Sequence, residues 1–203
     1  MTSAALLTSV VATSDVQRAA VNAADELFTL HGITPVTLPE IAAHAQVDAT
    51  ILRRAYPEKR DLVVAVLAFK HQQWFAEMDR IGRTHDDPRD EILAVFTYLE
   101  ECFTEPSWRG CVFITGYGDV SRQEPDIAHL AGQHLDAVEQ HIGVLCARAG
   151  IPSHIAETLN LLIQGAQTES AIHHTVQPAR AARSGAAMLM SIYQSEHSPL
   201  DFF

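Results

Sequence analysis

The sequence predicts an all-α protein, with a small N-terminal helical domain followed by a larger helical body. Apolar residues recur at three- and four-residue spacing through most of the chain. Glycines and prolines separate these periodic segments, and no segment shows the pattern that we would accept as a strand. With 203 residues, 47% of them hydrophobic, the chain is long enough to bury a sizeable core.

The first helix is predicted between Asp15 and His31, where one apolar stripe follows the helical period. Ser14 or Asp15 is available as the N-cap, and Gly32 follows as a C-terminal stop. Residues 1–13 are expected to form a flexible N-terminal extension. They contain no Lys or Arg, so they lack the charged region of a secretory signal.

Two short helices are predicted next, over Leu38–His44 and Ala49–Ala55. Thr37 and Glu40 have the spacing of a capping box, in which the hydroxyl and the carboxylate each accept a backbone N–H of the first turn. Asp48 is placed to cap the second short helix. These two helices and the one before them predict a three-helix domain of the helix-turn-helix kind.

The second short helix presents a small and basic face to solvent. Four of the six basic side chains before residue 71 lie between positions 53 and 60, although the whole chain has a net charge of −11. A helix, a tight turn and a second helix with such a face have the dimensions to enter a major groove. The overall charge excludes a protein that coats nucleic acid or adheres broadly to anionic membrane, so any contact with DNA must be local.

A longer pattern of small, apolar and basic residues covers Val16–Leu67. It comprises Ala23-Ala24, Leu27-Phe28, Gly32, Thr37, Ile41-Ala42, Ala45, Val47, Leu52, Tyr56, Lys59 and Leu62. With this spacing, the segment resembles the N-terminal domain of the TetR family of bacterial transcriptional regulators. The resemblance implies a helix-turn-helix DNA-binding domain over residues 14–62, here called the reading head, and a helical ligand-binding and dimerisation domain over residues 63–203.

The resemblance also implies which residues contact DNA. Arg53 and Lys59 would lie at positions that contact phosphate, Thr37 would hydrogen-bond backbone near the start of the second helix, and Ala49 with Thr50 would face the bases. The full set of implied DNA-binding residues is Thr37, Asp48, Ala49, Thr50, Arg53, Arg54, Tyr56 and Lys59.

The sequence departs from the family pattern at three positions. Gln46 stands at a turn position usually filled by Gly, where it must adopt a positive φ at a cost of about 1 kcal/mol or less. Arg53 and Ala55 stand where the family most often has Tyr and His. We expect a ligand-responsive, sequence-specific regulator, most simply a homodimeric repressor that a small apolar molecule releases from its operator. The alternative is a TetR-like helical dimer that binds a small molecule but whose reading head has lost DNA binding.

The rest of the chain is predicted to be helical. The expected helices of the body are Glu58–Arg83, Pro88–Phe103, Pro125–Ala149, His154–Val176 and Ala179–Ser195.

A segment between residues 105 and 118 is rich in glycine and aromatic residues, and its Gly110-Cys111-Val112-Phe113 run is similar to a segment of many TetR-like ligand domains. Members of that family commonly couple small-molecule binding to release of DNA, so the resemblance implies a small apolar or aromatic effector. A packed core is the alternative for each aromatic residue. The candidates for lining a cavity are Trp74, Met78, Phe96, Cys102, Phe103, Trp108, Phe113, Tyr117, His134, Gln164 and Thr168.

The last two predicted helices are apolar on more than one face, and such a helix needs a partner beyond its own body. Two copies meeting there would form an isologous four-helix interface, as in the resembled family. Such a homodimer would carry two reading heads and bind a pseudo-palindromic operator in double-stranded DNA. The predicted interface residues are Leu159, Leu162, Ile163, Ala166, Ala182, Ala186, Leu189 and Tyr193, with Met188 and Ile192 beside them.

The histidines form no recognisable catalytic or metal-binding pattern. His134 and His141 are seven residues apart, and His173 and His174 are adjacent, so neither pair has the four-residue spacing of two helical ligands. No Cys or Ser lies in a nucleophile motif. We therefore expect no enzymatic activity, no cofactor and no metal site.

The three cysteines, Cys102, Cys111 and Cys146, are widely spaced and odd in number. In a chain large enough to fold without disulfide bonds, this pattern predicts reduced thiols and a cytoplasmic protein. No apolar run approaches the length of a membrane span, so no membrane partner is expected.

Overall fold

A computed structural model describes residues 14–193, and this part of the chain is helical and contains no strand. The predicted all-α class is thereby confirmed. The helices form two compact units: the first comprises the described residues up to Glu77 together with Arg109–Leu135, and the second comprises Met78–Trp108 and the described residues from Asp136 onward. The extension expected over residues 1–13 lies outside the described residues.

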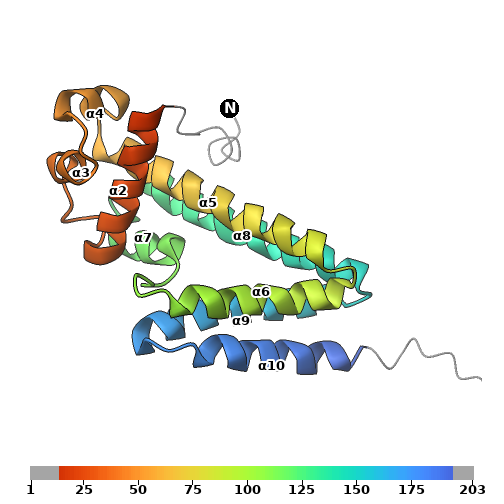
Figure 1. Cartoon of the computed structure of the whole chain (residues 1–203). Coiled ribbons are helices and arrows are strands. Elements are labelled where there is room, and N and C mark those ends of the chain that lie inside the picture. Colours follow the sequence, from red (N-terminus) through yellow and green to blue (C-terminus); the bar gives the residue numbers. More distant parts are fainter. Residues whose placement is uncertain (1–13, 194–203) are drawn as a thin grey trace, which may run out of the picture. The chain divides into compact units, whose positions relative to one another are not determined.

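The reading head contains α2 (Asp15–His31), α3 (Leu38–His44) and α4 (Ala49–Ala55), which pack against one another (Figure 1). All three have the bounds that the sequence predicts. Ser14 begins α2 through a capping box with Gln17, and Gly32 ends it with φ 81°.

Side-chain caps also define the two short helices. The amide and hydroxyl of Thr37 both donate to a carboxylate oxygen of Glu40 at 2.7 Å, and the amide of Glu40 donates back to the hydroxyl at 3.4 Å. The carboxylate of Asp48 accepts from the amides of Thr50 at 2.8 Å and Ile51 at 3.2 Å. Because a seven-residue helix has few internal hydrogen bonds, these caps satisfy a large share of its exposed donors.

Apolar side chains from every helix of the reading head meet in one core. Ile41 and Ala24 are fully buried in it, and Leu52 is 1% exposed. The core continues along α5 (Lys59–Thr84) through Leu62, Val66 and neighbouring residues. The head therefore shares its interior with the helix that leads out of it, and the predicted boundary at residue 62 remains a prediction.

The sequence did not predict α7 (Val112–Val120), which belongs to the first unit. Two glycines lie inside this nine-residue helix, and no side chain caps its start at Cys111. Both features weaken the local signal for a helix. Packing stabilises α7, since Phe113 is 3% exposed and Gly116 lies against Ile33.

In the second unit, α10 (Gln177–Ser191) packs on both α6 (Pro88–Thr104) and α9 (Ser153–His173) (Figure 1). The sequence predicted α9 to continue to Val176. It ends earlier because His174 adopts the left-handed conformation, with φ 51° and ψ 49°. The remaining helix, α8 (Pro125–Arg148), contributes residues to both units.

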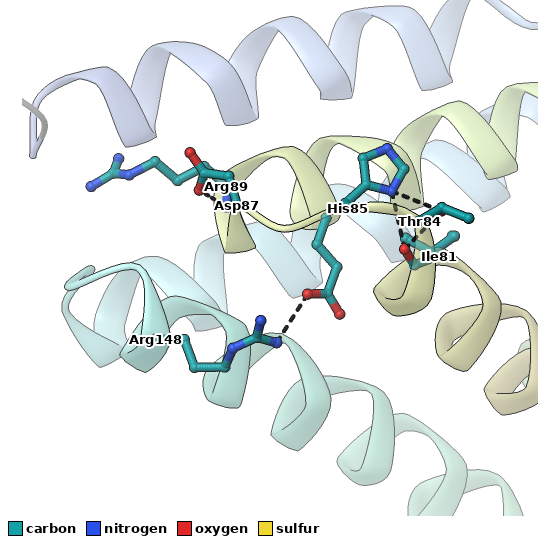
Figure 2. A network of polar contacts seen from close by, with 7 residues as sticks. Ile81, Thr84, His85, Asp87, Arg89 and Arg148 are labelled. Carbon is teal, nitrogen blue, oxygen red and sulfur yellow. Dashed lines mark hydrogen bonds and ion pairs between the residues drawn. The ribbon is translucent and has the colours of Figure 1, made fainter.

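Polar contacts fix the helix ends of the second unit (Figure 2). At the end of α5, the hydroxyl of Thr84 donates to the carbonyl of Ile81 at 2.9 Å, and Nδ1 of His85 lies 3.0 Å from the same oxygen. Asp87 caps α6 by accepting from the amide of Arg89 at 2.8 Å. The Arg89 guanidinium donates to the carbonyls of residues 190 and 149 at 2.9 and 3.0 Å. This one side chain therefore satisfies carbonyl acceptors at the ends of both α10 and α8.

Glu91 is a buried carboxylate of α6, and it is 4% exposed. Arg148, which Figure 2 labels, donates to it at 2.9 Å. Gly82 makes room for it, because a Cβ at that position would stand 2.9 Å from the other carboxylate oxygen.

Candidate functional site

The exposed face of α4 carries most of the residues expected to contact DNA. Ala49, Thr50, Arg53 and Arg54 are all exposed. Ile51 is 49% exposed beside them, whereas Leu52 anchors the helix in the core. A short helix with its small residues at the N-terminal end and its cations at the C-terminal end has the shape of a recognition helix.

The cations of the reading head differ in what they contact. Of the six basic side chains from residue 18 to residue 70, four have partners within the protein. Arg18 pairs with Asp15, Arg60 with Glu124 and Asp126, and Lys70 with Asp25, while Lys59 donates to backbone carbonyls.

Within residues 14–193, the structure gives Arg53 and Arg54 no such partner. The two guanidiniums on α4 are therefore the charges of the head that remain available to an external anion.

Two other expected contact residues already make hydrogen bonds within the head. The Thr37 hydroxyl donates to Glu40, whose pKa is lowered by the hydroxyl and then by the amide of Thr37. Asp48 caps α4, and the amide of Ile51, followed by that of Thr50, lowers the pKa of its carboxyl group. Both carboxylates are therefore charged at neutral pH and accept hydrogen bonds at the N-terminal ends of α3 and α4.

Tyr56 and Lys59 do not lie on the exposed face with the arginines. Tyr56 is 5% exposed and belongs to the core of the head, where burial raises the pKa of its phenol. The Lys59 ammonium donates to the carbonyls of Ile33, Thr34 and Val36 at 3.0, 2.9 and 3.1 Å. An ammonium has three donors, so these contacts use all of them. The phosphate contact expected of Lys59 remains a prediction, and the sequence could not show that the loop after α2 folds back onto its ammonium.

Gln46 adopts the positive φ that its place in the turn between α3 and α4 requires, at 56°. The backbone closes the turn in spite of the side chain, with the amide of Val47 donating to the carbonyl of Ala42 at 3.0 Å. The departure at Gln46 therefore leaves the helix-turn-helix geometry intact.

The residues expected to line a ligand cavity divide between the two units. Trp74, Phe113, Tyr117 and His134 belong to the first unit, and the other seven belong to the second. Within the first unit, α5, α7 and α8 bring Trp74, Phe113 and His134 together, whereas Tyr117 is 54% exposed.

The centre of this group is a pair of histidines. The His134 ring stacks on Phe113 with centroids 3.7 Å apart, and its Nδ1 lies 3.1 Å from Nδ1 of His71. Phe75 packs against His71 at 4.7 Å between centroids. Burial, followed by the neighbouring His71, lowers the pKa of His134 to about 3, and burial lowers the pKa of His71 as well. Both rings are therefore neutral at neutral pH, and one can donate a hydrogen bond to the other.

The second unit holds the remaining ligand candidates in different surroundings. Met78 and Phe96 are each 1% exposed and form core, and Phe103 packs on Trp108 with centroids 4.9 Å apart. Cys102 and Gln164 are half-buried, and Thr168 is exposed on α9.

Each unit also contains a cavity, and neither cavity includes any of the predicted ligand residues. One of about 400 Å³ in the second unit is lined by α5, α6 and Arg183. One of about 310 Å³ in the first unit lies between α7 and the end of α2 with its following loop.

Five of the eight predicted dimer residues are buried within the chain. Leu159, Ile163, Ala166, Ala182 and Ala186 are between 0% and 6% exposed, because α10 packs on α6 and α9 in the same chain. Within the single chain this stripe is interior, and the dimer contacts of these residues remain a prediction. Leu162, Leu189 and Tyr193 are half-buried.

Different faces of the same two helices are apolar and exposed. On α9, Leu161 and Ile172 are 68% and 62% exposed, and Gly165 and Thr168 lie between them at helical spacing. On α10, Met188 is 71% exposed, the C-cap Ile192 is 63% exposed, and Ala181 and Ser184 continue that face. We call this set the α9–α10 face. Large apolar residues separated by small ones permit a close approach by another helix.

Sequence reasoning missed His71 and Asp119. His71 follows the helical period of the neighbouring apolar residues, so a helical projection of α5 would have found it beside Trp74. Asp119 carried no local signal, because its partners are 85 and 86 positions away along the chain.

The cysteine side chains of the described residues lie wholly or partly inside the fold. The three cysteines are thiols; Cys102 and Cys111 are half-buried, and Cys146 is buried. Burial raises the pKa of Cys111 and raises that of Cys146 to about 11. Over residues 14–193, no group of three or more metal-binding side chains occurs, and no helix has the length and apolarity to cross a membrane.

Comparison with known proteins agrees with this geometry. Residues 20–66 match the family model of bacterial regulatory proteins of the tetR family. The HTH-type transcriptional regulator YjdC of Escherichia coli is 25% identical over 145 residues, which cover 69% of this chain and 75% of YjdC.

Two solved structures share the fold. A TetR-family transcriptional regulator from Streptomyces coelicolor superposes with a TM-score of 0.81 at 20% identity, covering 87% of this chain and 94% of that one. A transcriptional regulator from Saccharomonospora viridis, solved in complex with choline, has a TM-score of 0.70 at 16% identity, covering 86% and 94%.

The three helices of the reading head thus have the arrangement of a helix-turn-helix domain. More narrowly, residues 20–66 match the tetR-family model, and the fold of residues 14–193 resembles that of solved TetR-family transcriptional regulators.

Proposed function

We propose that this protein is a sequence-specific DNA-binding repressor of the TetR family, which acts as a homodimer and responds to a small apolar or aromatic molecule. One observation carries the DNA-binding part. Of the six basic side chains of the head and its following helix, only Arg53 and Arg54 lack a partner among residues 14–193, and both lie on the exposed face of α4. In an acidic chain, this leaves a local positive charge at the place where a recognition helix meets phosphate.

The test is fluorescence anisotropy with duplex DNA taken from beside the protein's own gene, at several salt concentrations. We expect salt-sensitive binding, and replacing Arg53 and Arg54 by Ala should weaken it and lower the salt slope by about 2, because each arginine releases roughly one counterion per phosphate. Arg183→Ala is the matched control, since Arg183 is an exposed cation of the second unit. No salt-sensitive binding to any such fragment would refute the proposal and leave the alternative of a head that no longer reads DNA.

The α9–α10 face supports a homodimer. It places four strongly exposed apolar side chains on two helices that already pack together. A second copy meeting this face would bury them in a symmetric four-helix interface, and two reading heads would then bind a pseudo-palindromic operator.

Analytical ultracentrifugation measures this directly. Met188→Lys and Leu161→Lys should each weaken the dimer, whereas Leu30→Lys should leave it unchanged, since Leu30 is 54% exposed in the reading head. A monomeric wild-type protein, or a dimer that all three variants retain, would contradict the proposed interface.

The group around His134 supports an effector site. Trp74, Phe113 and Phe75 supply aromatic surface, and the neutral pair of His71 and His134 supplies one donor and one acceptor. A flat aromatic molecule with one polar group fits this chemistry better than a charged one, because the buried histidines resist charge.

Trp74 provides the signal for a binding assay. In a Trp108→Phe background, titration with 1-naphthol should quench the remaining tryptophan, and His134→Leu should remove the effect. Quenching that persists in the His134→Leu protein would place the binding elsewhere.

A further inference from the structure

Asp119 of α7 holds the loop that joins α2 to α3. One carboxylate oxygen accepts from the amides of Ile33 at 2.7 Å and Thr34 at 3.0 Å, and the other accepts from the Thr34 hydroxyl at 2.6 Å. Burial by itself would raise the pKa of this carboxyl group. The hydroxyl and amide of Thr34, the amide of Ile33 and the charge on Lys59 together hold it below its usual value.

Lys59 holds the same loop by donating to the loop's backbone carbonyl groups. Its ammonium donates to the oxygens of residues 33, 34 and 36, so the loop has its amides bound by α7 and its carbonyls bound by α5. Lys59 lies in the segment that matches the family model, whereas Asp119 lies well outside it. We refer to these two side chains and residues 33–36 as the loop clamp.

The surfaces of α7 and the loop are shaped for close approach. Gly116 lies one turn before Asp119, and a Cβ there would stand 3.3 Å from Cδ1 of Ile33. A Cβ on Gly32 would lie 3.4 Å from the Asp119 carboxylate, and Gly32 also has φ +81°. The contact is therefore built from two close backbone approaches as well as from hydrogen bonds.

The clamped loop leads directly into the DNA-contacting part of the head. Val36 is its last residue, and Thr37 is the N-cap of α3. The start of α3 is thus set by where the loop is held, and α4 packs on α3 through the next turn. A displacement of loop residues 33–36 would therefore change the orientation of the exposed face of α4.

We infer that Asp119 is a positioning residue for DNA reading, which belongs to the reading head by function although it lies 86 positions beyond Ile33. This inference rests on the proposed DNA-binding function. Asp119 contributes no charge that attracts DNA, so its effect on affinity must come through the geometry of the loop.

The loss of charge and the loss of loop geometry predict opposite changes in DNA affinity for Asp119→Ala, so the variant distinguishes the two effects. Removal of a negative charge by itself would leave DNA binding unchanged or tighten it. Loss of the clamp should weaken binding to the specific duplex about tenfold. This is the effect expected if ordering the loop on binding costs about the free energy of one net hydrogen bond. The salt slope should stay the same, because no phosphate contact is lost.

Three further variants complete the experiment. Asp119→Asn keeps an oxygen that can accept from both amides, and it should restore binding to within about threefold of the wild type. Asp136→Ala removes an equal charge from an exposed position of α8 and should not weaken binding. Thr34→Val removes one hydrogen bond of the clamp and should weaken binding less than Asp119→Ala does.

Amide hydrogen exchange supplies a readout that does not involve DNA. Exchange at Ile33 and Thr34 should be faster in Asp119→Ala than in the wild type, at a temperature where circular dichroism shows both proteins folded. Faster exchange with unchanged or tighter DNA binding would overturn the positioning role. Wild-type protein that binds no DNA would overturn this inference and the proposed function together, whereas wild-type binding with an unaffected Asp119→Ala variant would overturn this inference alone.

Discussion

The buried histidine of the first unit should make the stability of the protein depend on pH. His134 is 4% exposed and its pKa is lowered to about 3, from 6.5 in an unfolded chain. The unfolded state therefore binds a proton on this residue over a range in which the folded state does not. For a base whose folded pKa is depressed, the stability is fully present above pH 6.5 and is lost as pH falls toward 3.

The size of this effect follows from the two pKa values. One pKa unit corresponds to about 1.4 kcal/mol, and between pH 7 and pH 5 His134 alone should remove about 2 kcal/mol from the free energy of unfolding. His71 acts in the same direction, because burial lowers its pKa too. A loss of this size is a large fraction of the stability of a typical domain.

Urea unfolding followed by circular dichroism at pH 7 and pH 5 measures the difference, at one fixed protein concentration. His134→Phe keeps an aromatic ring against Phe113 and removes the titrating group, so it should lose less stability than the wild type over this interval. His129→Gln changes an exposed histidine and should lose as much as the wild type. Equal losses in wild type and His134→Phe would refute the burial argument, whatever their absolute stabilities at pH 7.

Three other substitutions test local features of the fold by thermal or urea unfolding at pH 7. Gln46→Gly should stabilise the protein by up to about 1 kcal/mol, because Gly adopts φ 56° without the strain of a side chain; a loss of stability would show that Gln46 makes a compensating contact. Thr37→Ala should cost about 1 kcal/mol by removing the cap of α3, and an unchanged midpoint would contradict the role of the capping box. Gly82→Ala should cost about 1–3 kcal/mol because its Cβ would stand 2.9 Å from the carboxylate of Glu91; no loss would mean that Glu91 and Arg148 shift without strain.

The reading head shows how far local sequence patterns can be trusted. Thr37, Glu40 and Asp48 are caps whose partners lie two or three residues away, and the helices they begin have the predicted bounds. Gln46 was expected to have a positive φ, and it does. These features depend on contacts within one or two turns, so spacing alone reveals them.

Lys59 and α7 mark the limit of that reasoning. Lys59 looked like one more cation of a basic cluster, yet its ammonium is used by carbonyls 23 to 26 positions away. The helix α7 has a poor local signal and exists because Phe113 and Gly116 pack against distant parts of the first unit. In both cases the deciding contacts come from residues far apart in the chain.

The two C-terminal helices show the same limit for surfaces. Their apolar residues on several faces correctly indicated that each would have more than one neighbour. The pattern did not separate the buried faces from the exposed ones, because apolar periodicity is the same whether a stripe meets the chain's own core or another molecule. Only the packing of α10 on α6 and α9 decides that Leu159 and Ala186 are interior while Leu161 and Met188 are exposed.

The sequence by itself therefore determined the helical class, the caps, the turn and the resemblance of the head to TetR-family regulators, since all of these depend on neighbours along the chain. The tertiary structure decided which cations are free, which apolar face is exposed and which distant carboxylate holds the loop before α3. Those are properties of long-range contacts, in which a side chain's role depends on what the fold brings beside it.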